Sequence, residues 1–351
     1  MMNKDFITRA DTKKNEYLLK TEDLFVINKD KWFADFAKHF RDICAQIQKQ
    51  QIESALSAIS YLEYTMLYTN LINRKYDADI FVYSDKHYLN KSQRFVGSYD
   101  ISSILVYYDK LWNELTAMKK FYVGKVTAHD VTRFMLKALS DFYSYLVNIA
   151  RFVIAECIDE SPFINIDKNE KFMVNIGDYM SITEPVYVEE KNKDANTLAK
   201  WFSDRHSNEY AFGDYSNLDF SCIAFTYTDF RYARFRNSTL KRTDFSGSSL
   251  IGTNFSKASM ERCRMNHCSI SEADFSYAKL NNACFKKALG KAGLSDKKKW
   301  EFAGFLPVSF RNADLTNTDF TKADLTGADF TGAIINGTNF SGANLDNAIF
   351  D

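Results

Sequence analysis

The chain has 351 residues, enough for two domains of ordinary size. Its 45 basic and 45 acidic side chains give a formal net charge of zero, which argues against a generally basic nucleic-acid-binding protein and equally against a strongly acidic one. The hydrophobic content of 46% excludes wholesale disorder, and six cysteines without a C-x-x-C pair do not indicate a disulfide framework.

No targeting or membrane-spanning segment is predicted. The first residues lack the apolar stretch of a signal peptide. The longest apolar run, 142–158, contains Asn148, Arg151 and Glu156, which is typical of a buried helix rather than a membrane span. We therefore expect a cytoplasmic protein in a reducing compartment, with no membrane partner.

Apolar residues spaced by three or four positions predict helices in the N-terminal half. The first two predicted helices are 32–47 and 52–67, and Gln48–Gln51 between them form either a turn or a polar face. A third helix is capped by Asp100 and ended by Gly124, and a long fourth helix begins at a capping box of Thr127 and Asp130. Two extended pieces are predicted as well, 78–84 and a hairpin over 163–176 that turns at Lys168–Glu170. We expect residues 1–195 to form a mainly α-helical domain with one or two short hairpins, and 184–197 to contain the linker that follows it.

From Phe220 onward, large apolar residues recur every five positions. The frame holds up to residue 285 and returns from 305, as shown by Phe225, Phe245, Met265, Phe285, Phe305 and Phe310. The residue two places before each large one is small in most units, and the residue between them is often Asp or Asn. A period of five fits neither a helix nor a strand, but it fits a chain that turns a corner every five residues.

Four such sides would close a square coil of about 20 residues, and successive coils would stack at the inter-strand spacing of about 4.8 Å. One small and one large side chain then point inward from each side. This stacking predicts that Phe225, Phe245, Met265 and Phe285 form one interior column.

Strings such as ADFSYAKL, ADLTNTDFTKADLTGADF and ANLDNAIF resemble the pentapeptide-repeat family. The resemblance covers residues 210–285 and 301–351, and it implies a right-handed quadrilateral β-helix. The predicted fold class is therefore an α+β chain in two parts, with the mainly helical domain over 1–195 followed by a pentapeptide-repeat solenoid over 196–351.

Residues 286–300 interrupt the frame. Gly290 and Ser295 fall where a large residue belongs, and Lys298 falls where a small inward-facing one belongs. We expect a loop extruded from a corner, after which Phe320 and Phe340 continue the column that ends at Phe285. The loop is either a solvated insertion or a contact loop, whose candidate residues are Lys286, Lys287, Lys291, Lys297, Lys298 and Lys299. The solvated insertion is the preferred interpretation, and projecting loops in family members that protect topoisomerases from quinolones support the contact loop as the alternative.

Charge is distributed unevenly along the repeats. Residues 216–285 carry nine basic and six acidic side chains, whereas 306–351 carry six aspartates against Arg311 and Lys322. The candidate acidic face consists of Asp314, Asp319, Asp324 and Asp329. Because the repeats continue to the last residue, we expect the terminal coil to form a homodimer through Ile349 and Phe350.

No catalytic or metal-binding constellation is predicted, and no cofactor is expected. Cys263, His267 and Cys268 suggest zinc, but the frame places both cysteines in small inward positions on two different sides, so filling space is the preferred interpretation. The recurring Asp and Asn residues suggest either a calcium ladder or hydrogen bonds to the turning backbone. The absence of a Gly-rich binding turn favours the backbone role. We therefore expect a protein that is not an enzyme.

The sequence predicts a non-catalytic binding or scaffold protein whose rigid β-helix surface contacts another protein, without direct binding to nucleic acid. The alternative, implied by the family resemblance, is a DNA mimic that binds DNA gyrase or topoisomerase IV, both type II topoisomerases, and protects it from quinolone-type inhibitors. Only the terminal coils are acidic enough for that role. The N-terminal domain either caps the first coil or binds a partner of its own, since it is larger than a cap requires. An enzyme in the helical half is a third class that no residue supports.

Overall fold

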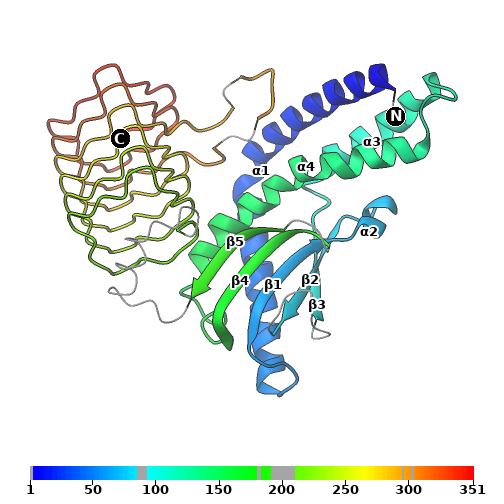
Figure 1. Ribbon diagram of the computed structural model, residues 1–351, viewed down its shortest axis with the longest axis horizontal. Helices are drawn as coiled ribbons and strands as arrows, with labels where there is room; N and C mark the ends of the chain where they lie inside the picture. Colours follow the sequence, from blue (N-terminus) through cyan, green and yellow to red (C-terminus); the bar gives the residue numbers. More distant parts are fainter. Residues whose placement is uncertain (1–2, 85–92, 180–182, 191–209, 295, 302–303) are drawn as a thin grey trace. The chain divides into compact units, whose positions relative to one another are not determined.

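The computed structural model describes residues 3–84, 93–179, 183–190, 210–294, 296–301 and 304–351. Contacts divide the chain into two compact units, Met1–Val188 with Asp296–Trp300, and Glu189–Ser295 with Glu301–Asp351. The helices and nearly all of the sheet belong to the first unit, and the stacked coils belong to the second (Figure 1).

The first unit combines one mixed sheet with helices. Its elements are α1 (Lys4–Ile52), β1 (Ile59–Met66), α2 (Tyr68–Ile72), β2 (Asp77–Tyr83), β3 (Arg94–Asp100), α3 (Val106–Met118), η1 (Lys119–Phe121), α4 (Ala128–Cys157), β4 (Lys168–Asp178) and β5 (Thr183–Glu190). The strand order is β3-β2-β1-β4-β5, in which β1 pairs antiparallel with β2 and parallel with β4. None of the helices in the described part of the chain is long and apolar enough to cross a membrane.

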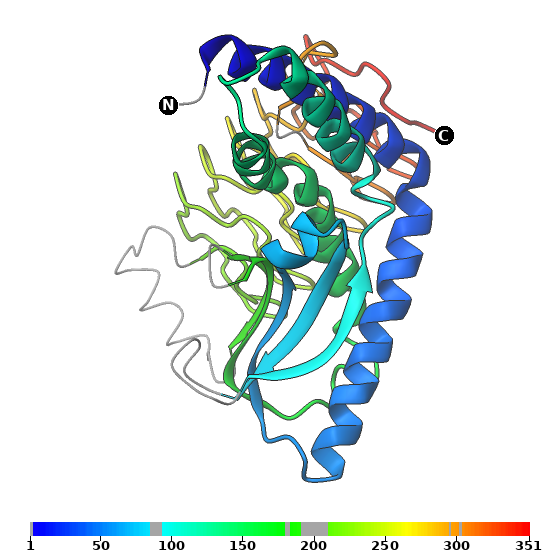
Figure 2. The ribbon, with the colours of Figure 1, turned by 90° about the vertical axis from the view of Figure 1, so that its right-hand side faces the viewer.

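Helix α1 runs beside the sheet and packs on it through aromatic residues (Figure 2). The ring centre of Phe36 lies 5.5 Å from those of Tyr64 in β1 and Tyr99 in β3, and the ring of His39 lies 4.5 Å from that of Tyr99. Helix α4 begins at a capping box in which Thr127 and Asp130 each accept a hydrogen bond from the other's backbone N–H. The predicted start of this helix is confirmed.

The sequence prediction for residues 48–67 is wrong. Of the two alternatives for Gln48–Gln51, the turn is wrong because α1 continues through Ile52. The second predicted helix is instead the strand β1. This strand lies in the middle of the sheet and is buried on both faces, so that even its polar residues Glu63 and Thr65 are only 2% exposed. Burial on both faces removes the alternation of polar and apolar residues that marks a strand.

The predicted hairpin at 163–176 is also wrong. Lys168–Asp178 form one continuous strand, β4, so the polar residues expected at a turn lie within it. The ammonium group of Lys168 lies 3.9 Å from the centre of the Phe163 ring, which explains how a lysine can be 7% exposed here. The domain contains a five-stranded sheet in which the consecutive strands β2 and β3 pair antiparallel, and the extended piece predicted at 78–84 is confirmed by β2.

Two further boundaries differ from the prediction. Asp100 accepts a hydrogen bond from the Ser102 N–H at 2.8 Å within a turn, and α3 begins only at Val106, so Asp100 is not its N-cap. The predicted linker at 184–197 begins inside β5, and the rest of it lies outside the described residues, as does the predicted domain boundary at 195/196.

The second unit is a solenoid in which parallel bridges join residues 20 positions apart. Four bridges recur in each coil, as at Asp244↔Arg264, Ser249↔Ser269, Asn254↔Asp274 and Ser259↔Lys279. Between them, the Phe245 N–H donates to the Arg264 carbonyl at 2.7 Å, and the Arg264 N–H donates to the Thr243 carbonyl at 3.0 Å. The unit is therefore a β-helix with four bridged segments in each coil, and the strand-like backbone groups are paired between coils.

The large residues fill the interior of the coils in columns. In the predicted column, the ring centres of Phe225 and Phe245 lie 5.5 Å apart. Beyond the interruption, Phe320 lies 4.9 Å from Phe285 and 5.4 Å from Phe340, and Phe245, Phe285 and Phe320 are all 0% exposed. The predicted column and its continuation are confirmed.

The interruption lies later in the chain than predicted. Bridge partners shift from 20 to 35 residues apart across it, so 15 residues leave the coil. The ladder continues through Ala292, whose N–H donates to the Thr326 carbonyl at 3.0 Å, and it resumes at Val308. The extruded segment is therefore 293–307 and not 286–300.

Two residues explain why the predicted bounds were wrong. Gly290 stays in a large position because Val308 fills the space beside it, and a Cβ added at Gly290 would lie only 2.8 Å from Val308 Cγ2. Phe305, which was expected to resume the frame, instead lies in the extruded segment and donates its N–H to the carboxylate of Glu272.

Polar residues stabilise each coil from two positions. The small inward residue donates to the preceding coil, as Thr243 Oγ1 does to the Phe220 carbonyl at 2.9 Å. The Asp or Asn that follows it accepts, through Oδ1, the N–H of the residue two positions later, as Asp244 does from Ser246 at 3.0 Å. The interpretation of these residues as partners of the turning backbone is confirmed.

Candidate functional site

The six lysines predicted to form one contact loop belong to two different segments. Lys286, Lys287 and Lys291 precede the extruded segment and remain in the coil, where the Lys287 N–H donates to the Thr321 carbonyl at 3.0 Å. Lys297, Lys298 and Lys299 lie within the extruded segment, and their side chains are exposed.

The tip of the extruded segment packs within the first unit, to which Asp296–Trp300 belong. The indole N–H of Trp300 donates to the hydroxyl of Tyr145 at 2.9 Å, and its backbone N–H donates to Asn15 Oδ1 at 2.8 Å. Tyr145 donates in turn to Glu22 at 2.8 Å, and burial raises the pKa of that carboxyl above its usual value. Trp300 thus gives the tip a packing role that the sequence did not predict.

The four aspartates of the predicted acidic face do not share a face. They are spaced by five residues, so each lies on a different side of one coil. Their bridges to the next coil therefore have different partners: Asp314↔Ile334, Asp319↔Asn339, Asp324↔Asn344 and Asp329↔Ile349. Each carboxylate also accepts the hydroxyl and the N–H of the Thr two positions later. They form a ring of turn-stabilising groups, which corrects the prediction of a single acidic face.

The last coil leaves apolar side chains exposed. Ile349 is 52% exposed and Phe350 is 41% exposed, although the Phe350 ring stacks on that of Phe330 with centres 4.8 Å apart. These two residues are placed as the sequence predicted, and their role in self-association stays a prediction.

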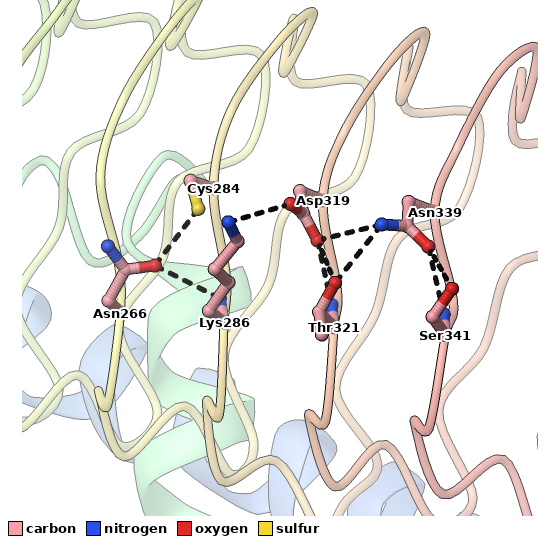
Figure 3. A network of polar contacts seen from close by, with 7 residues as sticks. All are labelled: Asn266, Cys284, Lys286, Asp319, Thr321, Asn339 and Ser341. Atoms are coloured by element: carbon pink, nitrogen blue, oxygen red, sulfur yellow. Dashed lines mark hydrogen bonds and ion pairs between the residues drawn. The ribbon is translucent and has the colours of Figure 1, made fainter.

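One side of the β-helix carries a continuous row of polar contacts (Figure 3). We name it the Phe285 side, because its inward residues are those of the Phe285 column described above. In this row, Asn266 Oδ1 accepts the Cys284 thiol at 3.0 Å and the Lys286 N–H at 3.1 Å. The ammonium group of Lys286 then pairs with Asp319 Oδ2 at 3.1 Å.

The row continues beyond Asp319. Asn339 Nδ2 donates to Thr321 Oγ1 at 3.1 Å, and the Ser341 hydroxyl donates to Asn339 Oδ1 at 2.6 Å. Partial burial opposes ionisation of Asp319, but hydrogen bonds from Thr321 and Lys286 outweigh it and hold the pKa of this carboxyl below its usual value. The same ion pair raises the pKa of Lys286, so both groups stay charged at neutral pH.

Two other acidic groups on or beside the Phe285 side are also neutralised. Asp244 pairs with Arg264 at 3.1 Å, and Glu261 pairs with Lys241 at 3.3 Å. These ion pairs are partly exposed, so they add little to stability, but they cancel the negative charge of this surface.

Cations without an ion pair occupy both edges of the Phe285 side, at the corner position two residues after each large residue. Arg242 and Arg262 lie on consecutive coils of one edge, the arginine edge, and Lys287 and Lys322 lie on consecutive coils of the other, the lysine edge. All four have φ between 55° and 62°, and all four are exposed. Within the described ranges, none of them forms an ion pair.

The cysteines occupy the positions that the frame predicts. Cys263 and Cys268 are buried and donate to the carbonyls of Leu240 and Phe245 at 2.6 and 2.9 Å, and burial raises the pKa of both thiols to about 12. Cys222 and Cys284 face outward, and all six cysteines are free. In the part of the chain that the structure describes, no group of three His, Cys, Asp or Glu residues could hold a metal ion.

Comparison with known families agrees with this architecture. A model of pentapeptide repeats, in eight copies, matches residues 219–256, 228–266, 248–286 and 309–347. The C-terminal region consists of pentapeptide repeats. The matched residues all lie in the C-terminal half, and no curated protein matches the chain.

Several solved structures similar to the chain are described as pentapeptide-repeat proteins. Rfr23 from the cyanobacterium Cyanothece is 17% identical and matches over 44% of this chain and 98% of its own length, with a TM-score of 0.19. HetL from Nostoc, described as involved in heterocyst differentiation regulation, is 15% identical over 45% of this chain and 98% of its own, with a TM-score of 0.16. QnrB1, described as a plasmid-mediated fluoroquinolone resistance protein, is 22% identical and matches over 39% of this chain and 77% of its own length, with a TM-score of 0.19. At these scores the similarities carry no argument about function.

Sequence reasoning missed the two charged edges of the pentapeptide repeats. It grouped the lysines by their nearness in the sequence, whereas the coil groups residues that are 20 positions apart, or 35 across the extruded segment. Once the coil length is known, the spacing of Arg242 and Arg262 and that of Lys287 and Lys322 identify both edges.

Proposed function

We propose that this protein is a non-catalytic binding or scaffold protein, in which the β-helix presents a rigid surface to another macromolecule. One observation carries this proposal: the interior of the coils is filled by side chains, and only the outer side chains remain for recognition. A rigid surface loses little conformational entropy on binding, which suits a scaffold. The right-handed sense of the coil is inferred from the family resemblance and stays a prediction.

The alternative is a DNA mimic that binds a type II topoisomerase. A DNA-like surface needs acidic groups along its length, but the aspartates of the last coils lie on four different sides and the acidic groups of the Phe285 side are paired with cations. Gyrase supercoiling assays with and without a quinolone, at stoichiometric protein, test this alternative. We expect neither inhibition nor protection.

Affinity capture tests the proposed function with one charge reversal on each side of the β-helix. The variants are Lys287→Glu at the edge of the Phe285 side, and Lys291→Glu, Lys257→Glu and Lys279→Glu on the other three sides. The full-length protein serves as bait, and unchanged thermal unfolding shows that each variant is folded. We expect at least one partner that the natural sequence captures and that one of the four variants loses. Failure to enrich any partner, or retention of every partner by all four variants, would contradict the proposal.

A further inference from the structure

We infer that the Phe285 side binds an acidic segment of a partner protein, whose carboxylates contact the arginine edge and the lysine edge. This inference rests on the proposed function and names the chemistry of the partner.

The positive charge of the two edges is not compensated by the acidic groups of the Phe285 side. The acidic groups Asp244, Glu261 and Asp319 are each paired with a cation of the same surface, so they cannot neutralise the cations of the edges. Four exposed positive charges remain, two on each edge. A surface with uncompensated charge of one sign attracts and orients a partner of the opposite sign.

The four cations of the two edges occupy regular positions on the β-helix. Arg242 and Arg262 occupy equivalent corner positions in adjacent coils, and so do Lys287 and Lys322. Adjacent coils are separated by about 4.8 Å, the spacing of neighbouring strands. The β-helix fixes the backbone at each of these positions through hydrogen bonds to the next coil, as when the Arg262 N–H donates to the Asn281 carbonyl at 3.0 Å. The charges are therefore presented on a rigid frame.

The backbone of the Phe285 side is not available for recognition of a partner. On the Phe285 side, the Met265 N–H donates to the Cys284 carbonyl and the Phe285 N–H to the Asp319 carbonyl, both at 2.7 Å. A partner therefore cannot add as a strand along this side, as peptides do at open sheet edges. It has to be recognised by the side chains of the two edges and of the polar row between them (Figure 3).

Carboxylates fit this surface better than a phosphodiester backbone. Proteins that hold nucleic acid by charge commonly neutralise about 6–10 phosphates, or combine a basic groove with a series of aromatic rings. The Phe285 side offers four free cations, and among the described residues its exposed rings are the phenol of Tyr227, 87% exposed, and the imidazole of His267. The guanidinium groups of the arginine edge bind carboxylates and phosphates alike in bidentate geometry, so the preference for carboxylates rests on the small number of free cations and of exposed aromatic rings.

Fluorescence anisotropy of the full-length protein tests the inference, with a labelled hexaglutamate peptide as the probe. Two variants each remove one edge, Arg242→Gln with Arg262→Gln, and Lys287→Gln with Lys322→Gln. The control, Lys257→Gln with Lys291→Gln, removes the same charge from other sides. We expect each edge variant to weaken binding about tenfold or more at low salt, the control to weaken it less than about twofold, and added salt to weaken the binding of the natural sequence.

Three results would overturn the inference: no binding of the peptide at low salt, equal weakening by edge and control variants, or tighter binding of single-stranded or duplex DNA through the same edges. Failure of the inference is distinguishable from failure of the proposed function. A captured partner that Lys257→Glu loses and Lys287→Glu retains would leave the proposed function intact and remove the Phe285 side as its site.

Discussion

Replacement of Phe285 by alanine tests whether the interior columns stabilise the coils. Phe285 is 0% exposed, and its ring centre lies 4.9 Å from that of Phe320 and 5.5 Å from that of Phe275. Truncating a buried phenylalanine to alanine costs about 3–5 kcal/mol, because the apolar contacts are lost and a cavity is left. Since 1.4 kcal/mol corresponds to a tenfold change in an equilibrium constant, local opening should become roughly 100-fold to several thousand-fold more frequent.

Hydrogen exchange followed by mass spectrometry measures this opening in the full-length protein. We expect faster exchange of the backbone amides of 275–290, which lie in and beside the altered coil. Tyr227→Ala is the control, because Tyr227 is 87% exposed and its loss should change stability by less than about 0.5 kcal/mol. If Phe285→Ala accelerated exchange no more than the control does, the reasoning from a packed interior would be refuted.

Four other predictions concern two hydrogen bonds, one buried histidine and the exposed apolar residues of the last coil. Thr253→Val removes the hydroxyl that donates to the Phe230 carbonyl at 2.9 Å, and should lower the unfolding free energy of the repeats by about 1 kcal/mol in denaturant titrations; an unchanged midpoint would contradict this. Trp300→Phe removes the donor to Tyr145 and should destabilise the first unit by a similar amount, about 1 kcal/mol, whereas the exposed Lys299→Gln should not; equal effects of the two would refute a specific role for Trp300. Burial lowers the pKa of His39 from 6.5 to about 4, so the unfolded chain binds more protons than the folded chain between these pH values. The free energy of unfolding should therefore fall as the pH drops from 6.5 towards 4, by about 1–3 kcal/mol after allowance for the partial exposure of His39. The variant His39→Phe should lose less unfolding free energy over this pH range. The same pH dependence of stability in the variant and in the natural sequence would contradict the attribution of the loss to His39. Light scattering should show that the natural sequence is a dimer and that the double variant Ile335→Ser with Ile349→Ser weakens this dimer. The control Leu289→Ser, whose side chain is 56% exposed on another coil, should leave the dimer unchanged, and a monomeric natural sequence would refute self-association.

The repeat half could be predicted from the sequence because a single residue spacing determines it. Each unit contributes one large side chain such as Phe245, and the same local pattern repeats along the chain, so every coil is encoded by its own residues and its neighbours. The extruded segment could be recognised but not located. Its 15 residues are a multiple of five, so the numerical frame is the same wherever it leaves the coil, and Phe305 matched that frame by coincidence.

The sheet of the N-terminal half could not be predicted because its pairings join residues far apart in the chain. The central strand β1 pairs in parallel with β4, as at Leu62↔Val174, and burial on both faces hides its alternation. The site was missed for a related reason. The predicted stacking of Phe320 on Phe285 implies that Lys322 lies beside Lys287, but the predicted bounds of the extruded segment, 286–300, removed Lys287 from the coil.

Side-chain footprinting by hydroxyl radicals, with the full-length protein alone and bound to its captured partner, tests the central claim most directly. If recognition uses the outer surface of the β-helix, oxidation should decrease at exposed residues of the Phe285 side, including Tyr227 and His267, while buried Phe245 and Met265 should be unreactive in both states. Protection confined to the first unit, or increased oxidation of Met265 on binding, would contradict the account.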